Sequence, residues 1–119
     1  MSSVRILLRL RDGRRLPVDP EEIFFVESEG GDTWVRMRGK RRLREVRTFG
    51  ELIDELAPHG FVRIHRGHAV NLLRVREIRP SRDGGWEVRL DPPVNRVLPV
   101  SRRQASDLFA AYGEGEPGG

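Results

Sequence analysis

The sequence contains no cysteine, which excludes disulfide frameworks, thiolate zinc sites and cysteine nucleophiles. It also lacks an apolar run long enough to span a membrane and a signal-peptide pattern at its N-terminus, so we expect a soluble, cytoplasmic protein without membrane insertion. Hydrophobic residues make up 37% of the 119 residues, which is low but above the range of disordered chains. We expect one domain over residues 1–112, followed by a flexible polar tail at 113–119.

Lysine is almost absent as well. Lys40 is the only lysine among 22 basic residues, which leaves 21 arginines, and the net charge is +4. An arginine-rich codon usage explains many of them. Arginine also forms bidentate contacts with phosphates and guanine edges that lysine cannot form. Charge alone therefore favours an anionic partner only weakly, and the positions of the arginines have to decide.

The sequence has little that points to catalysis. Nucleophile elbows, phosphate-binding loops and dinucleotide fingerprints are missing. The three histidines, His59, His65 and His68, are a weak metal signal, because a zinc site needs three or four ligands and no cysteine completes the set. We therefore expect no catalytic residue, no metal and no cofactor, and we do not expect an enzyme.

What the sequence does contain is a series of short runs in which apolar and charged residues alternate, the pattern of half-buried strands. The first two, 4–11 and 14–18, flank Asp12-Gly13, a strong hairpin signal. Further strands are expected at 23–27, 33–38, 41–47, 61–64, 74–79, 86–90 and 95–100. Eight to ten short antiparallel strands without strand–helix alternation predict a mainly β fold with two or three short helices.

Two capping patterns mark the starts of the longer helices. Thr48 with Glu51, and Ser101 with Gln104, match the capping box, in which each partner satisfies a free backbone N–H of the other. Each is followed by apolar residues at helical spacing. For the second helix these are Ala105, Leu108, Phe109 and Tyr112.

The segment FVRIHRGHAVN, residues 61–71, is the most specific in the chain. Strand alternation would place Phe61, Arg63 and His65 on one face. The four residues His65 to His68 then interrupt two apolar stretches with a small cationic tip. Such a tip can carry a side chain into a major groove, since its glycine permits close approach to a backbone.

Three residues of this segment have different expected roles. We expect His65 to form a structural hydrogen bond rather than a base contact. Asn71 lies within AVNLL and is expected to be a buried amide whose hydrogen bonds are satisfied. Arg66 has no evident structural role, which makes it the candidate reader of an anionic or nucleic-acid partner.

Arg102 and Arg103 occupy the first two positions of the second predicted helix, where the helix dipole disfavours cations. A phosphate bound there would meet two guanidinium groups and free backbone N–H donors. Alternatively, both arginines point into solvent and the small penalty is tolerated. This feature alone leaves the two interpretations even.

Taken in order, these pieces resemble the LytTR DNA-binding domains of bacterial regulators of the AlgR/AgrA/LytR type. The resemblance covers about residues 4–112. It rests on IFFVES, TWVRMR, TFGELIDEL, FVRIHRGHAVN, VREI and LPVSR, which are individually degenerate but specific in their order and spacing. It implies an elongated stack of antiparallel β-sheets.

The resemblance also implies that three loops along one edge enter successive major grooves of double-stranded DNA. Thr33, Arg66 and Arg102 correspond to base-contacting positions, and Gly67 and Arg103 to phosphate-contacting ones. Some members have a histidine in place of Thr33 and an asparagine in place of Arg66, so base preference does not transfer. Arginine at position 66 would favour guanine by its geometry.

The expected function is that of a sequence-specific transcription regulator that binds direct repeats as two protomers. Most relatives carry a phosphoacceptor receiver or a membrane segment, and this chain begins at its first DNA-domain strand, as expected of a stand-alone regulator or an excised output domain. A separate sensor or inhibitor protein would then supply control. Two alternatives remain open: a small basic RNA-binding β protein, and a protein-interaction module that modulates another regulator.

Overall fold

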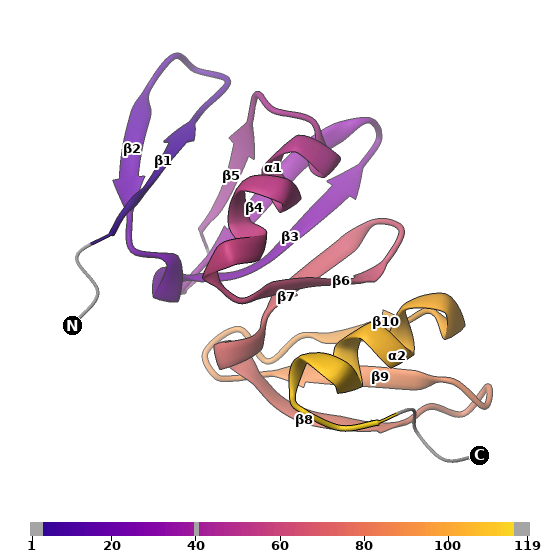
Figure 1. Cartoon of the computed structure of the whole chain (residues 1–119). Helices are drawn as coiled ribbons and strands as arrows, with labels where there is room; N and C mark the ends of the chain where they lie inside the picture. Colours follow the sequence, from indigo (N-terminus) through magenta and orange to yellow (C-terminus); the bar gives the residue numbers. More distant parts are fainter. Residues whose placement is uncertain (1–3, 40, 116–119) are drawn as a thin grey trace.

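This computed structural model describes residues 4–39 and 41–115 (Figure 1). They contain ten strands, two α-helices and three 3-10 turns. The strands are β1 (Ile6–Arg9), β2 (Arg15–Val18), β3 (Ile23–Glu29), β4 (Asp32–Met37), β5 (Arg42–Glu45), β6 (Phe61–His65), β7 (His68–Asn71), β8 (Val75–Pro80), β9 (Trp86–Leu90) and β10 (Val97–Val100). The helical elements are α1 (Phe49–Leu56), α2 (Arg102–Ala111), η1 (Pro20–Glu22), η2 (Ala57–His59) and η3 (Leu72–Arg74).

The strands form three antiparallel sheets, which confirms the predicted mainly β stack. Their orders are β1-β2, β5-β4-β3-β7-β6 and β10-β9-β8. The β1–β2 hairpin and the β8–β10 sheet lie at opposite ends, with the five-stranded sheet between them (Figure 1). Principal extents of 47 × 36 × 26 Å give the molecule its elongated outline.

Strands β3 and β7 of the five-stranded sheet carry buried residues on both faces, so the sheet separates two hydrophobic cores. The first core joins one face to α1 and to the β1–β2 hairpin, and the second joins the other face to α2 and the β8–β10 sheet. Strand β3 is central to both. Its register shifts between Ile23 and Phe25, and this bulge lets the successive Phe24 and Phe25 both enter the second core.

Both long helices begin where the sequence predicts, but only the first has a complete capping box. The Thr48 hydroxyl accepts the Glu51 N–H, and the Glu51 carboxylate accepts the Thr48 N–H. The predicted second box is half formed: the Ser101 hydroxyl accepts the Gln104 N–H at 3.3 Å. The second predicted bond, from the Ser101 N–H to the Gln104 side chain, is wrong. The Ser101 N–H donates instead to the Ile64 carbonyl oxygen at 2.8 Å.

Helix α2 ends in a Schellman motif. Gly113 has φ +81°, and its N–H donates to the Ala110 carbonyl at 2.9 Å. The Glu114 N–H reaches back to the Phe109 carbonyl at 2.9 Å. The first two residues of the segment expected to be a flexible tail are therefore bonded to the helix, and its last four lie outside the described residues.

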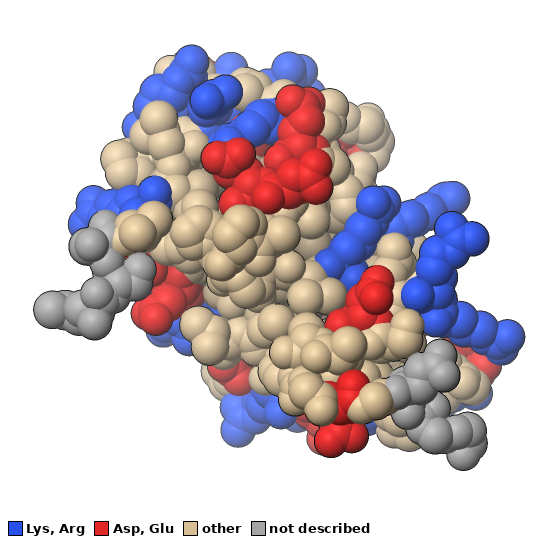
Figure 2. All heavy atoms as spheres, in the orientation of Figure 1, with Lys and Arg blue, Asp and Glu red and all other residues tan. Residues whose placement is uncertain are grey.

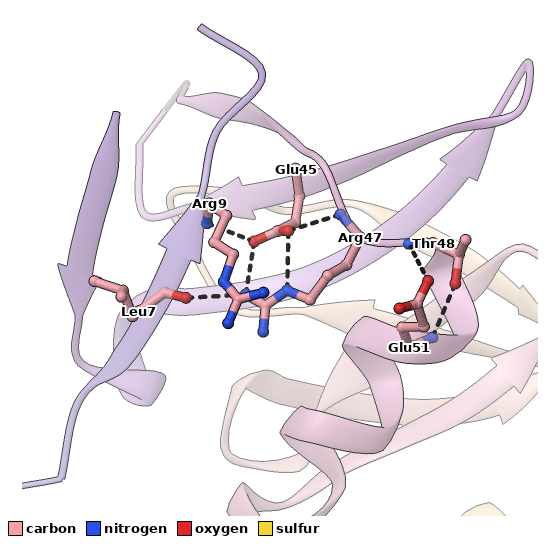
Figure 3. A network of polar contacts seen from close by, with 6 residues as sticks. All are labelled: Leu7, Arg9, Glu45, Arg47, Thr48 and Glu51. Atoms are coloured by element: carbon pink, nitrogen blue, oxygen red, sulfur yellow. Dashed lines mark hydrogen bonds and ion pairs between the residues drawn. The ribbon is translucent and has the colours of Figure 1, made fainter. Parts of the chain in front are cut away.

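A buried carboxylate holds the β1–β2 hairpin to the central sheet (Figure 3). The Glu45 side chain accepts hydrogen bonds from the Arg9 N–H and from the backbone and guanidinium of Arg47, at 2.8–3.0 Å. Arg47 also donates to the Leu7 carbonyl at 2.9 Å. Burial acts to raise the pKa of Glu45, but the hydrogen bonds from Arg47 and Arg9 outweigh it, and the pKa lies below its usual value.

Candidate nucleic-acid interface

The turn between β6 and β7 carries Arg66 at an exposed tip. Its neighbour Gly67 lies against β3, where its carbonyl oxygen accepts the Ser28 N–H at 2.9 Å. A Cβ on Gly67 would lie 3.4 Å from the Ser28 carbonyl oxygen, in van der Waals contact with that strand. The backbone of the tip is thus anchored, while the Arg66 side chain forms no hydrogen bond or ion pair with another described residue.

His65 has the structural role expected of it. Its Nδ1 accepts the Gly67 N–H at 3.4 Å, and its ring lies 5.8 Å from that of His68. The prediction that His65 shares a strand face with Phe61 and Arg63 is wrong. A register shift after Arg63 places His65 opposite His68, which interrupts the alternation of side chains.

His68 is a half-buried imidazole directly behind this turn. Burial lowers its pKa below the usual value. The carboxylate of Glu27, 3.5 Å from His68 Nε2, opposes that shift, while His65 and Arg96 add to it. The balance keeps the imidazole predominantly neutral at neutral pH.

The first turn of α2 lies beside the β6–β7 turn. The hydrogen bond from Ser101 to Ile64 joins the residue that caps α2 to strand β6. Two clefts follow this edge, and both include His65 and Ser101 in their walls. One, of about 350 Å³, is lined by Arg66 and Arg103 among others, and the other, of about 400 Å³, by Arg102.

Basic side chains gather along this edge, over the β6–β7 turn and the start of α2 (right-hand side of Figure 2). Arg66, Arg102 and Arg103 are exposed, and none has an acidic partner within 4.0 Å among residues 4–39 and 41–115. The nearby carboxylate of Asp83 accepts hydrogen bonds from Ser81 and Gly85, which hold its pKa below the usual value. The charge of Arg102 also lowers the pKa of Asp83, and Asp83 and Glu87 line the same cleft as Arg102. The exposed arginines are therefore not ion-paired, but carboxylates lie near one of them.

Comparison with known proteins identifies the family of the domain. The family model described as the LytTr DNA-binding domain matches residues 13–113. The chain belongs to the LytTR DNA-binding domain family.

Two regulators and one solved structure are similar to this LytTR domain. The sensory transduction protein LytT of Oceanobacillus iheyensis is 28% identical over 84% of the chain, and the transcriptional regulatory protein YpdB of Escherichia coli K12 is 27% identical over 83%. The matched part spans only 41% and 40% of those proteins. The LytTr DNA-binding domain of a putative methyl-accepting/DNA response regulator from Bacillus cereus has the same fold, with a TM-score of 0.76 and 21% identity over 94% of this chain and 99% of that one.

The LytTR position corresponding to Thr33 differs from the expectation. Thr33 is 3% exposed and faces the first core, so its side chain does not reach the surface in this structure. The adjoining β3–β4 turn is bordered by two carboxylates that pair within the sheet, Glu29 with Arg42 at 2.5 Å and Asp32 with Arg44 at 2.7 Å. The arginines of this region are therefore neutralised, in contrast to those at the α2 end of the edge.

Two further residues of the domain are engaged inside it. Asn71 is 1% exposed and donates to the carbonyl oxygens of Pro20 and Ile23, while its own oxygen accepts the Leu73 N–H. This confirms the expected buried, satisfied amide. The N–H of Gly67 is directed at His65, so the phosphate contact expected of Gly67 stays a prediction that requires this bond to open.

Among residues 4–39 and 41–115 no three His, Asp or Glu side chains are grouped so that they could hold a metal ion. In the same residues no helix has the length and apolar character needed to cross a membrane. Sequence reasoning missed one residue at the interface, Arg63, whose guanidinium donates to the backbone of the β6–β7 turn. Its only signal in the sequence was its position three residues before Arg66.

Proposed function

We propose that this LytTR domain is a transcription regulator that recognises specific double-stranded DNA sequences through the edge formed by the β6–β7 turn and the start of α2. The observation that carries the proposal is a set of three exposed arginines that have no acidic partner within the described part of the chain. They lie on two segments joined by the Ser101–Ile64 hydrogen bond. By contrast, Arg42 and Arg44 beside the β3–β4 turn are paired with carboxylates. Membership of a DNA-binding domain family supports the same ligand.

In this proposal Arg66 and Arg102 enter the major groove and read base edges. Arg66 extends from a two-residue turn that is narrow enough to enter the groove, and its fork matches the O6 and N7 acceptors of guanine. Arg103 and the free N–H groups at the start of α2 bind a backbone phosphate. Thr33 is left out of this surface because its side chain is buried.

We further propose that two protomers bind direct repeats. One domain of this size covers an interface of about 600–1,000 Å², which is the area of a single recognition module. Two adjacent modules raise affinity without new kinds of contact, because binding the first raises the effective concentration of the second.

The aromatic residues favour duplex DNA over single-stranded RNA as the ligand. RNA-binding β proteins stack bases on exposed rings. Here Trp34 is covered by the Arg42 guanidinium, 4.0 Å from its ring centroid, and Trp86 packs edge-on against Phe109 at 5.0 Å. Trp86 also lines the cleft beside Arg102, so at most this one indole is available for stacking on the arginine-rich edge.

Selection of bound duplexes from a random pool tests the proposal. We expect an enriched motif that contains guanine and occurs twice in the same orientation. Recovery of no motif, together with equal affinity for all duplexes, would contradict sequence-specific recognition and would favour a module that acts on another protein. Preferential capture of RNA from a mixed pool would instead favour the RNA-binding alternative.

A further inference from the structure

Arg63 lies on β6 immediately before the β6–β7 turn and is exposed. Its Nε donates to the His65 carbonyl oxygen at 3.2 Å, and its Nη2 donates to the Arg66 carbonyl oxygen at 2.6 Å. The same guanidinium lies over the Phe49 ring, 5.1 Å from its centroid. One side chain thus connects two carbonyl groups of the turn to the first residue of α1.

These contacts leave the turn with support on two sides. On one side, the Ser28 N–H of β3 donates to the Gly67 carbonyl oxygen. On the other side, the Arg63 guanidinium donates to the carbonyl oxygens of His65 and Arg66. Rotation of the peptide after Arg66 would break the bond to Arg63. The direction in which Arg66 leaves the turn therefore depends on a guanidinium whose Nε–H edge faces the protein.

We propose that Arg63 is a positioning residue, which orients Arg66 for base reading and does not itself read a base. This inference rests on the proposed DNA recognition. Lysine cannot replace it, because an ammonium group is a point charge without the planar fork that spans two carbonyl oxygens. Lysine does preserve the positive charge, so it separates geometry from electrostatics.

The experiment compares Arg63→Lys and Arg63→Ala with the unaltered domain on the selected duplex and on random duplex, over a range of salt concentrations. We expect both variants to lose affinity for the selected site by about tenfold, the scale of one base contact. Affinity for random duplex and its salt slope should be unchanged in Arg63→Lys. Arg15→Lys is the matched control, because Arg15 also donates to a turn carbonyl, that of Gly13, in the distant β1–β2 hairpin.

Amide hydrogen exchange of the DNA-free domain provides a second readout, independent of DNA binding. The Ser28 amide should exchange faster in both Arg63 variants, while the Leu90 amide in the second core stays protected. Arg63 would be a phosphate contact, and the inference overturned, if Arg63→Lys bound like the unaltered domain and Arg63→Ala lost affinity for all duplexes. Unchanged Ser28 exchange would also overturn it. A different outcome is that the unaltered domain binds no duplex while the Ser28 amide exchanges faster in the Arg63 variants. The proposed function would then fail, but the conclusion that Arg63 supports the β6–β7 turn would stand.

Discussion

The backbone N–H of Ser101 donates to the carbonyl oxygen of Ile64 across 2.8 Å. Ser101 caps α2, and Ile64 lies two residues before Arg66, so this bond fixes the distance between the two arginine-bearing segments. Neither segment has to be ordered by the ligand, which reduces the entropy lost on binding. The two readers should therefore act as one rigid pair.

Arg66→Ala and Arg102→Ala should separate DNA reading from folding. Each should weaken binding to the selected site by about 1–3 kcal/mol and relax base preference at one position. Because both side chains are exposed and lack partners among the described residues, thermal stability should change by no more than ~0.5 kcal/mol. Gel shifts on matched and substituted duplexes, with melting curves, check this. Equal losses on specific and random DNA would reassign both residues to phosphate.

The affinity for duplex DNA should fall steeply with salt, with a log–log slope of ~0.9 for each neutralised phosphate. Arg103→Ala should weaken all duplexes alike and lower that slope by about one phosphate. Titrations at several salt concentrations measure both effects. A flat salt response would remove DNA as the main ligand.

A duplex with two half-sites should bind more tightly than a duplex with either half-site alone. The reason is the small area of a single module and the gain in effective concentration when two modules lie side by side. Varying the spacing between the repeats should alter the gain, because only some spacings let both protomers bind. Identical affinity for one and two half-sites would contradict paired binding.

Glu45→Gln should lower the free energy of unfolding by about 3 kcal/mol, the range seen when one partner of a buried ion pair is removed. The Glu45 side chain is fully buried and that of Arg47 is 11% exposed, so the guanidinium would keep its charge without a counterion. Glu51→Gln is the matched control, since glutamine also completes a capping box and little change is expected. Urea denaturation compares the two.

Stability should fall as the pH is lowered from about 6.5, the usual pKa of a histidine, because the pKa of His68 in the folded protein lies below it. The unfolded chain then takes up a proton more readily than the folded protein. This loss of stability is complete once the pH lies below the pKa of His68 in the folded protein. His68→Gln should remove the decline between about pH 6.5 and 5, where carboxylates such as Glu45 are still ionised. Melting temperatures of both proteins at the two pH values measure this decline. If His68→Gln lost as much stability as the unaltered domain, a group other than His68 would be responsible.

Local patterns in the sequence were sufficient for much of the fold. The Asp12-Gly13 hairpin, the Thr48 capping box and the buried amide of Asn71 each depend on neighbouring residues or on a strongly apolar context. Period-two alternation failed at the bulges, since a single extra residue reverses which face each later side chain occupies. His65 is the case that matters for the site.

The parts of the site that the sequence did not predict depend on residues that are distant along the chain. Ser101 loses its second capping bond because Ile64, 37 residues earlier, offers a carbonyl oxygen to its N–H. Thr33 is buried by the packing of β4 against the first core. Arg63 supports a turn through two carbonyl groups, a role that carries no residue-type signature.

The position of β3 between the two cores has a consequence for how the domain tolerates substitution. Four successive residues of this strand, 23–26, are fully buried, and two of them face each core. A change of volume there cannot relax toward solvent on either side, because both faces are closely packed. Random mutagenesis with selection for folded protein should therefore leave this tetrapeptide the least varied stretch of the chain, and a cut within it should yield no half that survives alone.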